Sequence, residues 1–170
     1  MNLPSFRIRI PLCLALLAAI AAFAVSSASA ATVVALGASN TYGKGVARNQ
    51  AFPAQLEAIL RAKGLNVRVV NAGINGDTTE SMLQRMDRAV PNGTSAVILQ
   101  PGGNDGRKGS PDRSAEIRSR LQARGIAVIM LPNNVFKGLP HQSDGQHLTP
   151  EGYRMIAEGL ASQVAGAIGR

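Results

Sequence analysis

The sequence predicts an α/β fold in which a four-stranded parallel sheet is covered by helices on both faces, a three-layer α/β/α arrangement. Short apolar runs rich in β-branched residues alternate with segments of helical periodicity. Each connection between successive runs is long enough to hold a helix, which parallel neighbours need as a crossover. Of the 170 residues, 45% are apolar and 16% are charged, a balance typical of one compact domain.

The individual elements follow from this alternation. The expected strands are Thr32–Leu36, Asn66–Val70, Ser95–Gln100 and Ile126–Leu131. The expected helices cover residues 53–63, 78–90, 111–124 and 150–168. Asp77, with Glu80 three residues later, predicts a capping box at the start of the second helix.

The first 30 residues are expected to be a secretory signal peptide outside the fold. Arg7 and Arg9 precede an almost unbroken apolar run over residues 10–25, and Ala28-Ser29-Ala30 supplies the small residues that a signal peptidase recognises. A membrane anchor is the alternative, but the run is shorter than the ~20 residues that a spanning helix needs. The sequence therefore predicts an exported protein, periplasmic or secreted, with one domain over residues 31–170.

The expected export and the amino-acid composition exclude several classes of function. Cys13, the only cysteine, lies inside the apolar run, so the mature chain is expected to have no thiol, disulfide or cysteine-bound metal. Removing Arg7 and Arg9 takes the basic count from 18 to 16 against 10 acidic residues, a net charge of +6. That balance favours peripheral contact with anionic partners or surfaces. Nucleic acid is a poor candidate because the chain has no Trp and few other aromatic residues to stack on bases.

Polar and glycine-containing segments cluster where ligands bind in this class of fold, beyond the carboxyl ends of the strands. They are Gly37–Asn40 after the first strand, Asn75–Asp77 after the second, Gly102–Asp105 after the third, and Asp144–His147 before the last helix. We expect these four loops to converge at one edge of the sheet.

The converging residues fill the roles of acyl transfer. Ser39 supplies a hydroxyl nucleophile, and His147, with Asp144 three residues before it, supplies a base whose tautomer a carboxylate can hold. The backbone N–H groups of Ser39 and Gly76 and the Asn104 amide are candidates for the donors of an oxyanion hole. Each residue taken singly has an ordinary structural explanation as a cap or a turn. Their occurrence together, in this order along the chain, is what indicates acyl transfer.

Neither a metal site nor a phosphate-binding loop is expected. His141, Asp144 and His147 recur at three-residue intervals, but the segment contains Gly145 and the chain has no third histidine, so no metal is expected. The glycines of residues 37–45 fit neither common phosphate-binding motif, and no cofactor is expected.

Four blocks of residues match a known family in content and order. They are Gly37-Ala38-Ser39, Asn71 to Thr79 (NAGINGDTT), Gly102 to Gly106 (GGNDG) and Asp144 to His147 (DGQH). The chain resembles the SGNH (GDSL-type) hydrolases, in particular their exported esterase, thioesterase and lysophospholipase branch. The resemblance spans nearly all of the mature chain and implies a flavodoxin-like fold.

Carried over by position, the resemblance implies Ser39 as nucleophile, His147 as general base and acid, and Asp144 as its orienter. It also implies the Ser39 N–H, the Gly76 N–H and the Asn104 side chain as oxyanion donors. The chain departs from the family at Ala38, where Asp is usual. It also has room for only one helix and one strand between its third and fourth blocks, which predicts the four-stranded sheet and an open cleft.

The predicted function is hydrolysis of carboxylic esters or thioesters of small or lipid acyl groups through an acyl-enzyme on Ser39. The expected partner is a small-molecule ester or acyl substrate. Two alternatives stay open: a carbohydrate O-acetylesterase, and a non-catalytic exported binding protein that retains the cleft.

Overall fold

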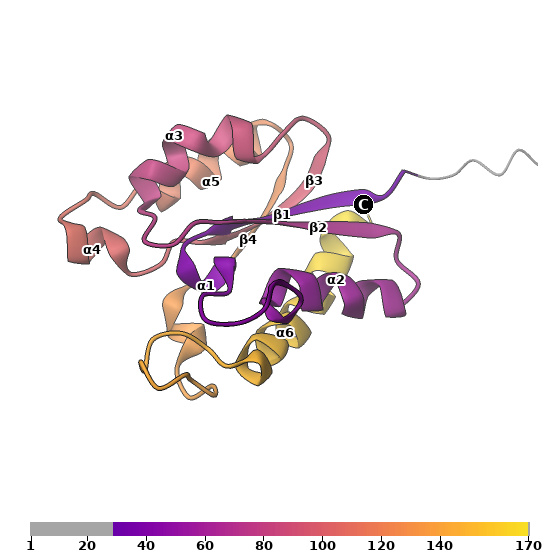
Figure 1. Ribbon diagram of the computed structural model, residues 1–170. Coiled ribbons are helices and arrows are strands. Elements are labelled where there is room, and N and C mark those ends of the chain that lie inside the picture. Colours follow the sequence, from indigo (N-terminus) through magenta and orange to yellow (C-terminus); the bar gives the residue numbers. More distant parts are fainter. Residues whose placement is uncertain (1–28, 170) are drawn as a thin grey trace, which may run out of the picture.

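Strands and helices alternate along the chain in the computed structural model, which describes residues 29–169 (Figure 1). The elements are β1 (Ala31–Gly37), α1 (Ser39–Tyr42), η2 (Arg48–Gln50), α2 (Phe52–Ala62), β2 (Val67–Gly73), α3 (Thr79–Ala89), β3 (Thr94–Gln100), α4 (Asn104–Lys108), α5 (Ser114–Ala123), β4 (Ala127–Met130), η3 (Asn133–Phe136) and α6 (Pro150–Ile168). The predicted signal peptide lies almost entirely outside the described residues. Within residues 29–169, no helix has the length and apolar character needed to cross a membrane.

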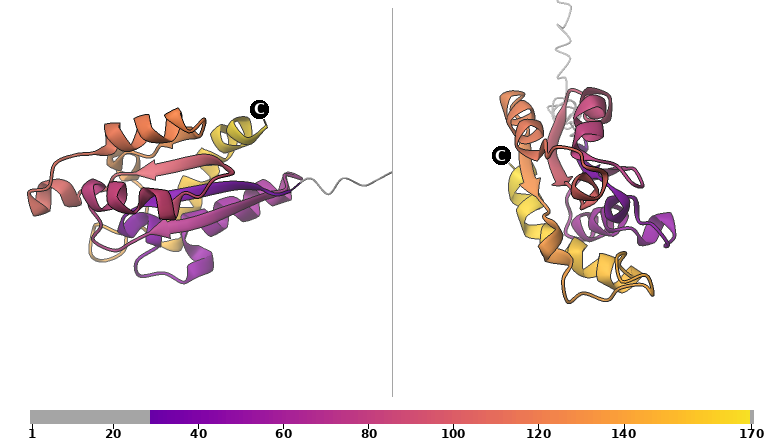
Figure 2. Two further views of the ribbon diagram at one scale, coloured as in Figure 1. Left: turned by 90° about the horizontal axis from the view of Figure 1, so that it is seen from above. Right: turned by 90° about the vertical axis from the view of Figure 1, so that its left-hand side faces the viewer.

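The four strands form one parallel sheet in the order β2-β1-β3-β4. Helices α3 and α5 lie on one face, and α2 and α6 lie on the other, with the sheet between them (Figures 1 and 2). The predicted three-layer α/β/α fold with a four-stranded parallel sheet is confirmed.

Alternation along β1 explains the two-sided core. Val33 and Ala35 pack into the cluster that α2 and α6 cover, whereas Val34 and Leu36 pack into the cluster under α3 and α5. All four side chains have no exposed surface. Because successive side chains of a strand point to opposite faces, a central strand buried on both sides must be apolar throughout.

The predicted capping box at the start of α3 is wrong. Thr78 caps the helix, its hydroxyl accepting the backbone N–H of Ser81 at 3.2 Å. The Asp77 carboxylate instead pairs with Arg85, with 2.7 Å between Oδ2 and Nη2. Arg85 also donates to the carbonyl of Ala72 at the end of β2. A buried ion pair at the sheet edge thus takes the carboxylate that a local pattern assigns to the helix.

Two further boundaries differ from the predicted ones. β2 continues through Gly73, and α5 begins only at Ser114. Two of the three residues before α5 bind α3 instead, since Thr79 Oγ1 donates to the Pro111 carbonyl and accepts from the Arg113 N–H. These long-range hydrogen bonds hold the segment out of the helix.

Candidate active site

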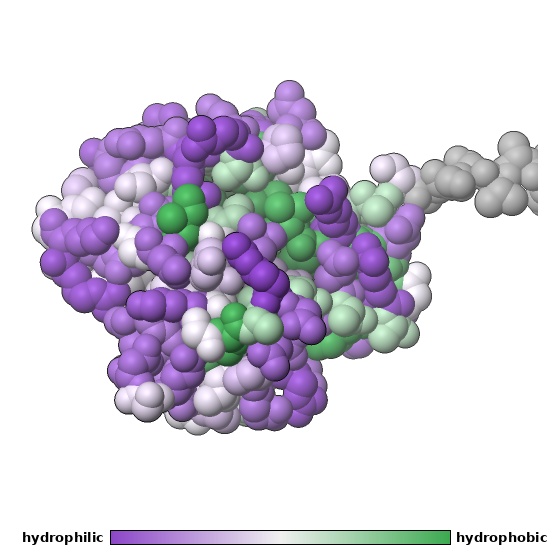
Figure 3. All heavy atoms as spheres, in the orientation of Figure 1, coloured by the Kyte–Doolittle hydropathy of each residue, from purple (hydrophilic) through white to green (hydrophobic). Residues whose placement is uncertain are grey.

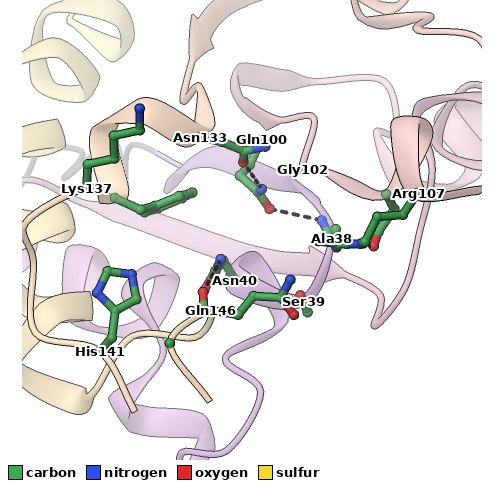
Figure 4. A pocket seen from close by; sticks show the side chains of 14 residues that line it. Ala38, Ser39, Asn40, Gln100, Gly102, Arg107, Asn133, Lys137, His141 and Gln146 are labelled. Carbon is green, nitrogen blue, oxygen red and sulfur yellow. Dashed lines mark hydrogen bonds between the residues drawn. The ribbon is translucent and has the colours of Figure 1, made fainter. Parts of the chain in front are cut away.

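The candidate nucleophile, Ser39, lies where β1 ends and α1 begins. A Cβ on Gly37 would overlap the Thr41 hydroxyl, and a Cβ on Gly73 would overlap the backbone of Tyr42. Glycine at both strand ends therefore lets α1 approach the sheet edge closely. The half-buried Ser39 side chain is left lining a cavity at that edge (Figure 4).

Ser39, His147 and Asp144 form a hydrogen-bonded chain. Ser39 Oγ lies 2.9 Å from His147 Nε2, and His147 Nδ1 lies 2.5 Å from Asp144 Oδ2. The imidazole is 3% exposed, whereas the carboxylate is 46% exposed. In this order the carboxylate keeps a proton on Nδ1, so that Nε2 can accept the proton of the serine. The structure thus brings together the three residues that the sequence predicts as a triad.

A tight turn before α6 presents His147 to the serine. Asp144 Oδ1 accepts the backbone N–H groups of Gln146 and His147, both at 2.9 Å. The Gln142 N–H donates to the His147 carbonyl at 2.8 Å and closes the turn. The hydrogen bond from the His147 side chain, followed by these two backbone N–H groups, holds the pKa of Asp144 well below its ordinary value of 3.8.

The depressed pKa of Asp144 predicts a pH-dependent contribution to stability. Because the folded pKa lies below the unfolded one, the ionised carboxylate stabilises the fold above about pH 3.8, and this contribution is lost as the pH falls through the folded value. We expect Asp144→Asn to melt at a lower temperature than wild type at pH 7 and the gap to shrink in strong acid. Circular dichroism melts over a pH series measure this gap, and an equal gap at every pH would contradict the ionic origin.

Asn40 connects the serine segment to the histidine turn and to α6. Its Nδ2 donates to the Gln146 carbonyl at 3.4 Å, and its Oδ1 accepts the hydroxyl of Tyr153 at 3.0 Å. Burial raises the pKa of Tyr153 to about 12, so the phenol remains a donor at neutral pH. Asn40, which follows the nucleophile Ser39, is thereby hydrogen-bonded to Gln146, which precedes the base His147.

The predicted oxyanion donors come from three loops at the same edge. Asn104 is buried, its Nδ2 donating to the Asp77 carbonyl at 2.7 Å and its Oδ1 accepting from Arg107 Nη2 at 2.6 Å. An amide nitrogen carries two hydrogens, so one N–H of Asn104 remains beyond the bond to Asp77. Ser39, as the first residue of α1, has a backbone N–H without an intrahelical acceptor. Gly76 follows β2 with φ of 74°, a conformation that favours glycine.

Gln100, at the end of β3, is hydrogen-bonded to the segment of residues 38–41 that contains Ser39. Its side chain is 1% exposed, and its Oε1 accepts from the Ala38 N–H at 3.1 Å and from the Thr41 hydroxyl at 3.0 Å. Its Nε2 donates to Asn133 Oδ1 at 3.2 Å (Figure 4). One amide therefore connects β3, the turn that carries Ser39, and η3.

The cavity beside Ser39 has a volume of about 360 Å³, and its walls are partly polar and partly apolar. Besides the serine turn, it is lined by side chains from β3, α4, η3 and the histidine turn; these include Gln100, Asn104, Arg107, Asn133, Phe136, Lys137, His141 and Gln146. Lys137 and His141 lie at one end, and Ser39 and Arg107 lie at the other (Figure 4). The surface around α4 is mainly hydrophilic (Figure 3).

Sequence reasoning misses several of these lining residues. Gln100 is the one with a visible signal, since it is a polar residue closing an otherwise apolar strand. Arg107, Asn133 and Lys137 carry no local pattern that distinguishes them from surface residues. His141 Nδ1 donates to the Leu139 carbonyl at 2.6 Å. Across residues 29–169, no three potential metal ligands lie close enough together to hold an ion.

Comparison with known proteins places this geometry in a family. The model of the GDSL-like lipase/acylhydrolase family matches residues 35–161, which include all four predicted loops. The chain is 32% identical over 110 residues to the esterase TesA of Pseudomonas aeruginosa, covering 61% of this chain and 55% of that protein. It is 30% identical over 124 residues to an arylesterase of Vibrio mimicus, covering 68% of this chain and 62% of that protein.

The fold agrees with solved structures of such proteins. A crystal structure of TesA superimposes with a TM-score of 0.65 at 24% identity, over 80% of this chain and 99% of that one. The chain spans less than two thirds of the length of the two curated relatives. The match to the family model nevertheless covers most of the chain, from β1 into α6, and the chain belongs to the GDSL-like lipase/acylhydrolase family.

Proposed function

We propose that this protein is a serine esterase that hydrolyses carboxylic esters through an acyl-enzyme on Ser39. The observation that carries the proposal is the chain of hydrogen bonds from Ser39 Oγ to His147 and from His147 to Asp144, at the wall of a cavity. The relatives named esterase and arylesterase support the same reaction class.

The geometry suits acylation of the serine. Ser39 Oγ attacks the ester carbonyl carbon as its proton passes to His147 Nε2, and the new oxyanion accepts hydrogen bonds from the Ser39 and Gly76 N–H groups and the Asn104 amide. The intermediate collapses, the ester C–O bond breaks, and the proton on His147 passes to the leaving alcohol. Asp144 stabilises the imidazolium throughout.

Deacylation reverses these roles. Water attacks the acyl carbonyl and gives a proton to His147 Nε2, and the acid leaves as that proton returns to Ser39 Oγ. Every proton transfer uses the one imidazole nitrogen that faces the serine. The chemistry then needs only side chains and backbone groups of this chain.

The cavity favours short acyl groups on polar alcohols. Phe136 is the one large apolar side chain among the described lining residues, and amide, guanidinium and ammonium groups make up most of the rest. A long hydrocarbon chain therefore finds only one large apolar side chain to cover there. This polar lining also supports the second candidate function, removal of acetyl groups from carbohydrate.

Hydrolysis of p-nitrophenyl esters from acetate to decanoate tests the proposal. We expect a burst of about one p-nitrophenol per protein chain as the acyl-enzyme accumulates, and the highest kcat/KM on the shortest esters. A p-nitrophenyl phosphonate is expected to add a covalent mass to wild type and none to Ser39→Ala. A folded protein that cleaves no ester and takes no label would instead be the non-catalytic binding protein.

A further inference from the structure

The cavity beside Ser39 is lined by two exposed cationic side chains and by no carboxylate of the described chain. Arg107 and Lys137 contribute permanent cations, and the lining residues include no Asp or Glu. Neither cation has a salt bridge within residues 29–169, whereas several, though not all, of the arginines on the helix surfaces do; these ion pairs are Arg61–Glu57, Arg113–Glu80, Arg120–Glu116 and Arg154–Glu151. Glutamates on α2, α3, α5 and α6 thus pair with arginines outside the cavity.

The carboxylates closest in sequence to the site are already engaged. Asp77 pairs with Arg85, Asp105 accepts the N–H and hydroxyl of Thr79, and Asp144 binds His147. None of these three carboxylates lines the cavity, so the permanently charged side chains that a ligand meets there are both cations. A cleft lined with charges of one sign concentrates ligands of the opposite sign.

Hydrogen-bond donors gather at one place in this cavity, in front of Gly103. A Cβ placed on Gly103 would lie 3.6 Å from Arg107 Nη1 and 3.6 Å from Asn133 Nδ2. The Arg107 guanidinium is held in place by its bond to Asn104 Oδ1, and Asn133 by its bond from Gln100 Nε2 to Oδ1. Each of these exposed side chains thus has one hydrogen bond that restricts its orientation, and each has N–H groups left to donate.

We infer that the ester substrate carries a carboxylate, which binds Arg107 and Asn133 in front of Gly103, while Lys137 adds positive charge at the other end of the cavity. The inference rests on the proposed ester hydrolysis at Ser39 and names the substrate class. A planar guanidinium beside an amide matches the two oxygens of a carboxylate. A neutral ester of the same shape offers the Arg107 guanidinium no negative charge to pair with. The class is therefore an ester whose acid or alcohol part bears a second, free carboxylate.

Matched ester pairs test this inference. 4-Acetoxybenzoate is compared with 4-acetoxybenzamide, which places the charge on the alcohol side, and monoethyl succinate with ethyl succinamate, which places it on the acid side. Each kcat/KM is divided by the rate constant for hydroxide-catalysed hydrolysis of the same ester, so that intrinsic reactivity cancels. We expect the anion to be preferred about tenfold in at least one pair at low ionic strength, and the preference to shrink severalfold in 0.5 M NaCl.

Substitutions at Arg107 and Lys137 test whether these two side chains cause the preference for the anionic ester. Arg107→Gln keeps a donor for Asn104 Oδ1 and loses the charge, so the anion-to-amide ratio is expected to fall towards one even where both rates drop together. Lys137→Gln is expected to lower the ratio about twofold to threefold. Lys63→Gln, an exposed lysine at the end of α2, is the matched control and is expected to keep the wild-type ratio. Ratios near one in both pairs for wild type would overturn the inference.

A binding measurement separates failure of this inference from failure of the proposed function. The melting temperature is measured with 4-hydroxybenzoate or 4-hydroxybenzamide, and with succinate or succinamate. A protein that cleaves no ester but is stabilised by the carboxylates and not by the amides keeps the anion site and refutes the esterase. Hydrolysis without preference, together with equal melting shifts, refutes the anion site and keeps the esterase.

Discussion

Replacement of Ser39 by alanine is expected to lower kcat/KM for p-nitrophenyl acetate by about 10⁴-fold or more, with little change in melting temperature. The half-buried hydroxyl makes one side-chain hydrogen bond in the described structure, to His147, so its removal costs the fold little. It removes the atom that forms the acyl-enzyme. Steady-state hydrolysis and a thermal melt of the same preparation measure both quantities.

The same loss is expected for His147→Ala, because nucleophile and base act as one unit. The Ser39→Ala/His147→Ala double variant should therefore lose no more than either single variant. His141→Ala is the matched control, since His141 also lines the cavity but does not bind Ser39 within the described structure, and a loss of less than about tenfold is expected. Losses that multiply in the double variant would show that Ser39 and His147 act independently and would contradict the triad.

The convergence of the candidate site was predictable because it depends on short-range patterns. Apolar runs ended by glycine or a polar residue fix where β1 and β3 stop, and parallel strands place their carboxyl ends at one edge. Ser39 and Asn104 begin the short helices that follow these two strand ends. The Asp144–His147 spacing is also local, because one turn closes all three hydrogen bonds of the carboxylate.

What the sequence could not show depends on contacts between distant segments. Asp77 precedes a helix, as an N-cap would, but Arg85 and the strand ends around it offer a buried partner that no local rule includes. The start of α5 moves because Thr79, more than thirty residues earlier, binds the backbone before it. Cavity walls such as Arg107 and Asn133 meet only after the loops have folded together.

The effect of having Ala38 where the family usually has aspartate also depends on contacts between distant segments. The Ala38 side chain is 2% exposed and packs in the core under α3 and α5. A Cβ on Gly102 would lie 3.0 Å from the Ala38 Cβ, so space around the methyl group is limited. The hydrogen bond that positions this residue comes from its own backbone N–H and ends on Gln100, a residue 62 positions later.

Gln100→Leu is expected to lower the free energy of unfolding by about 2–5 kcal/mol, because two buried donors lose their acceptor at once. Leucine fills a similar volume, but the Ala38 N–H and the Thr41 hydroxyl both end on Gln100 Oε1, and neither reaches water without moving the turn that carries Ser39. Urea unfolding measures the loss. Activity assayed well below the melting temperature is expected to fall as well, through kcat, since the displaced segment carries the nucleophile.

Two matched variants separate the contacts of the Gln100 amide. Asn133→Ala removes the partner of Nε2 and leaves both bonds to Oε1, so it should cost less than half as much stability as Gln100→Leu. Ala38→Asp adds the family's carboxylate to a segment that Gln100 already holds; we expect no gain in kcat/KM and a loss of stability from the buried charge. If Gln100→Leu unfolds with unchanged free energy, the amide does not hold the serine segment, whereas a gain in kcat/KM for Ala38→Asp would mean that the segment needs the carboxylate and that Gln100 does not replace it.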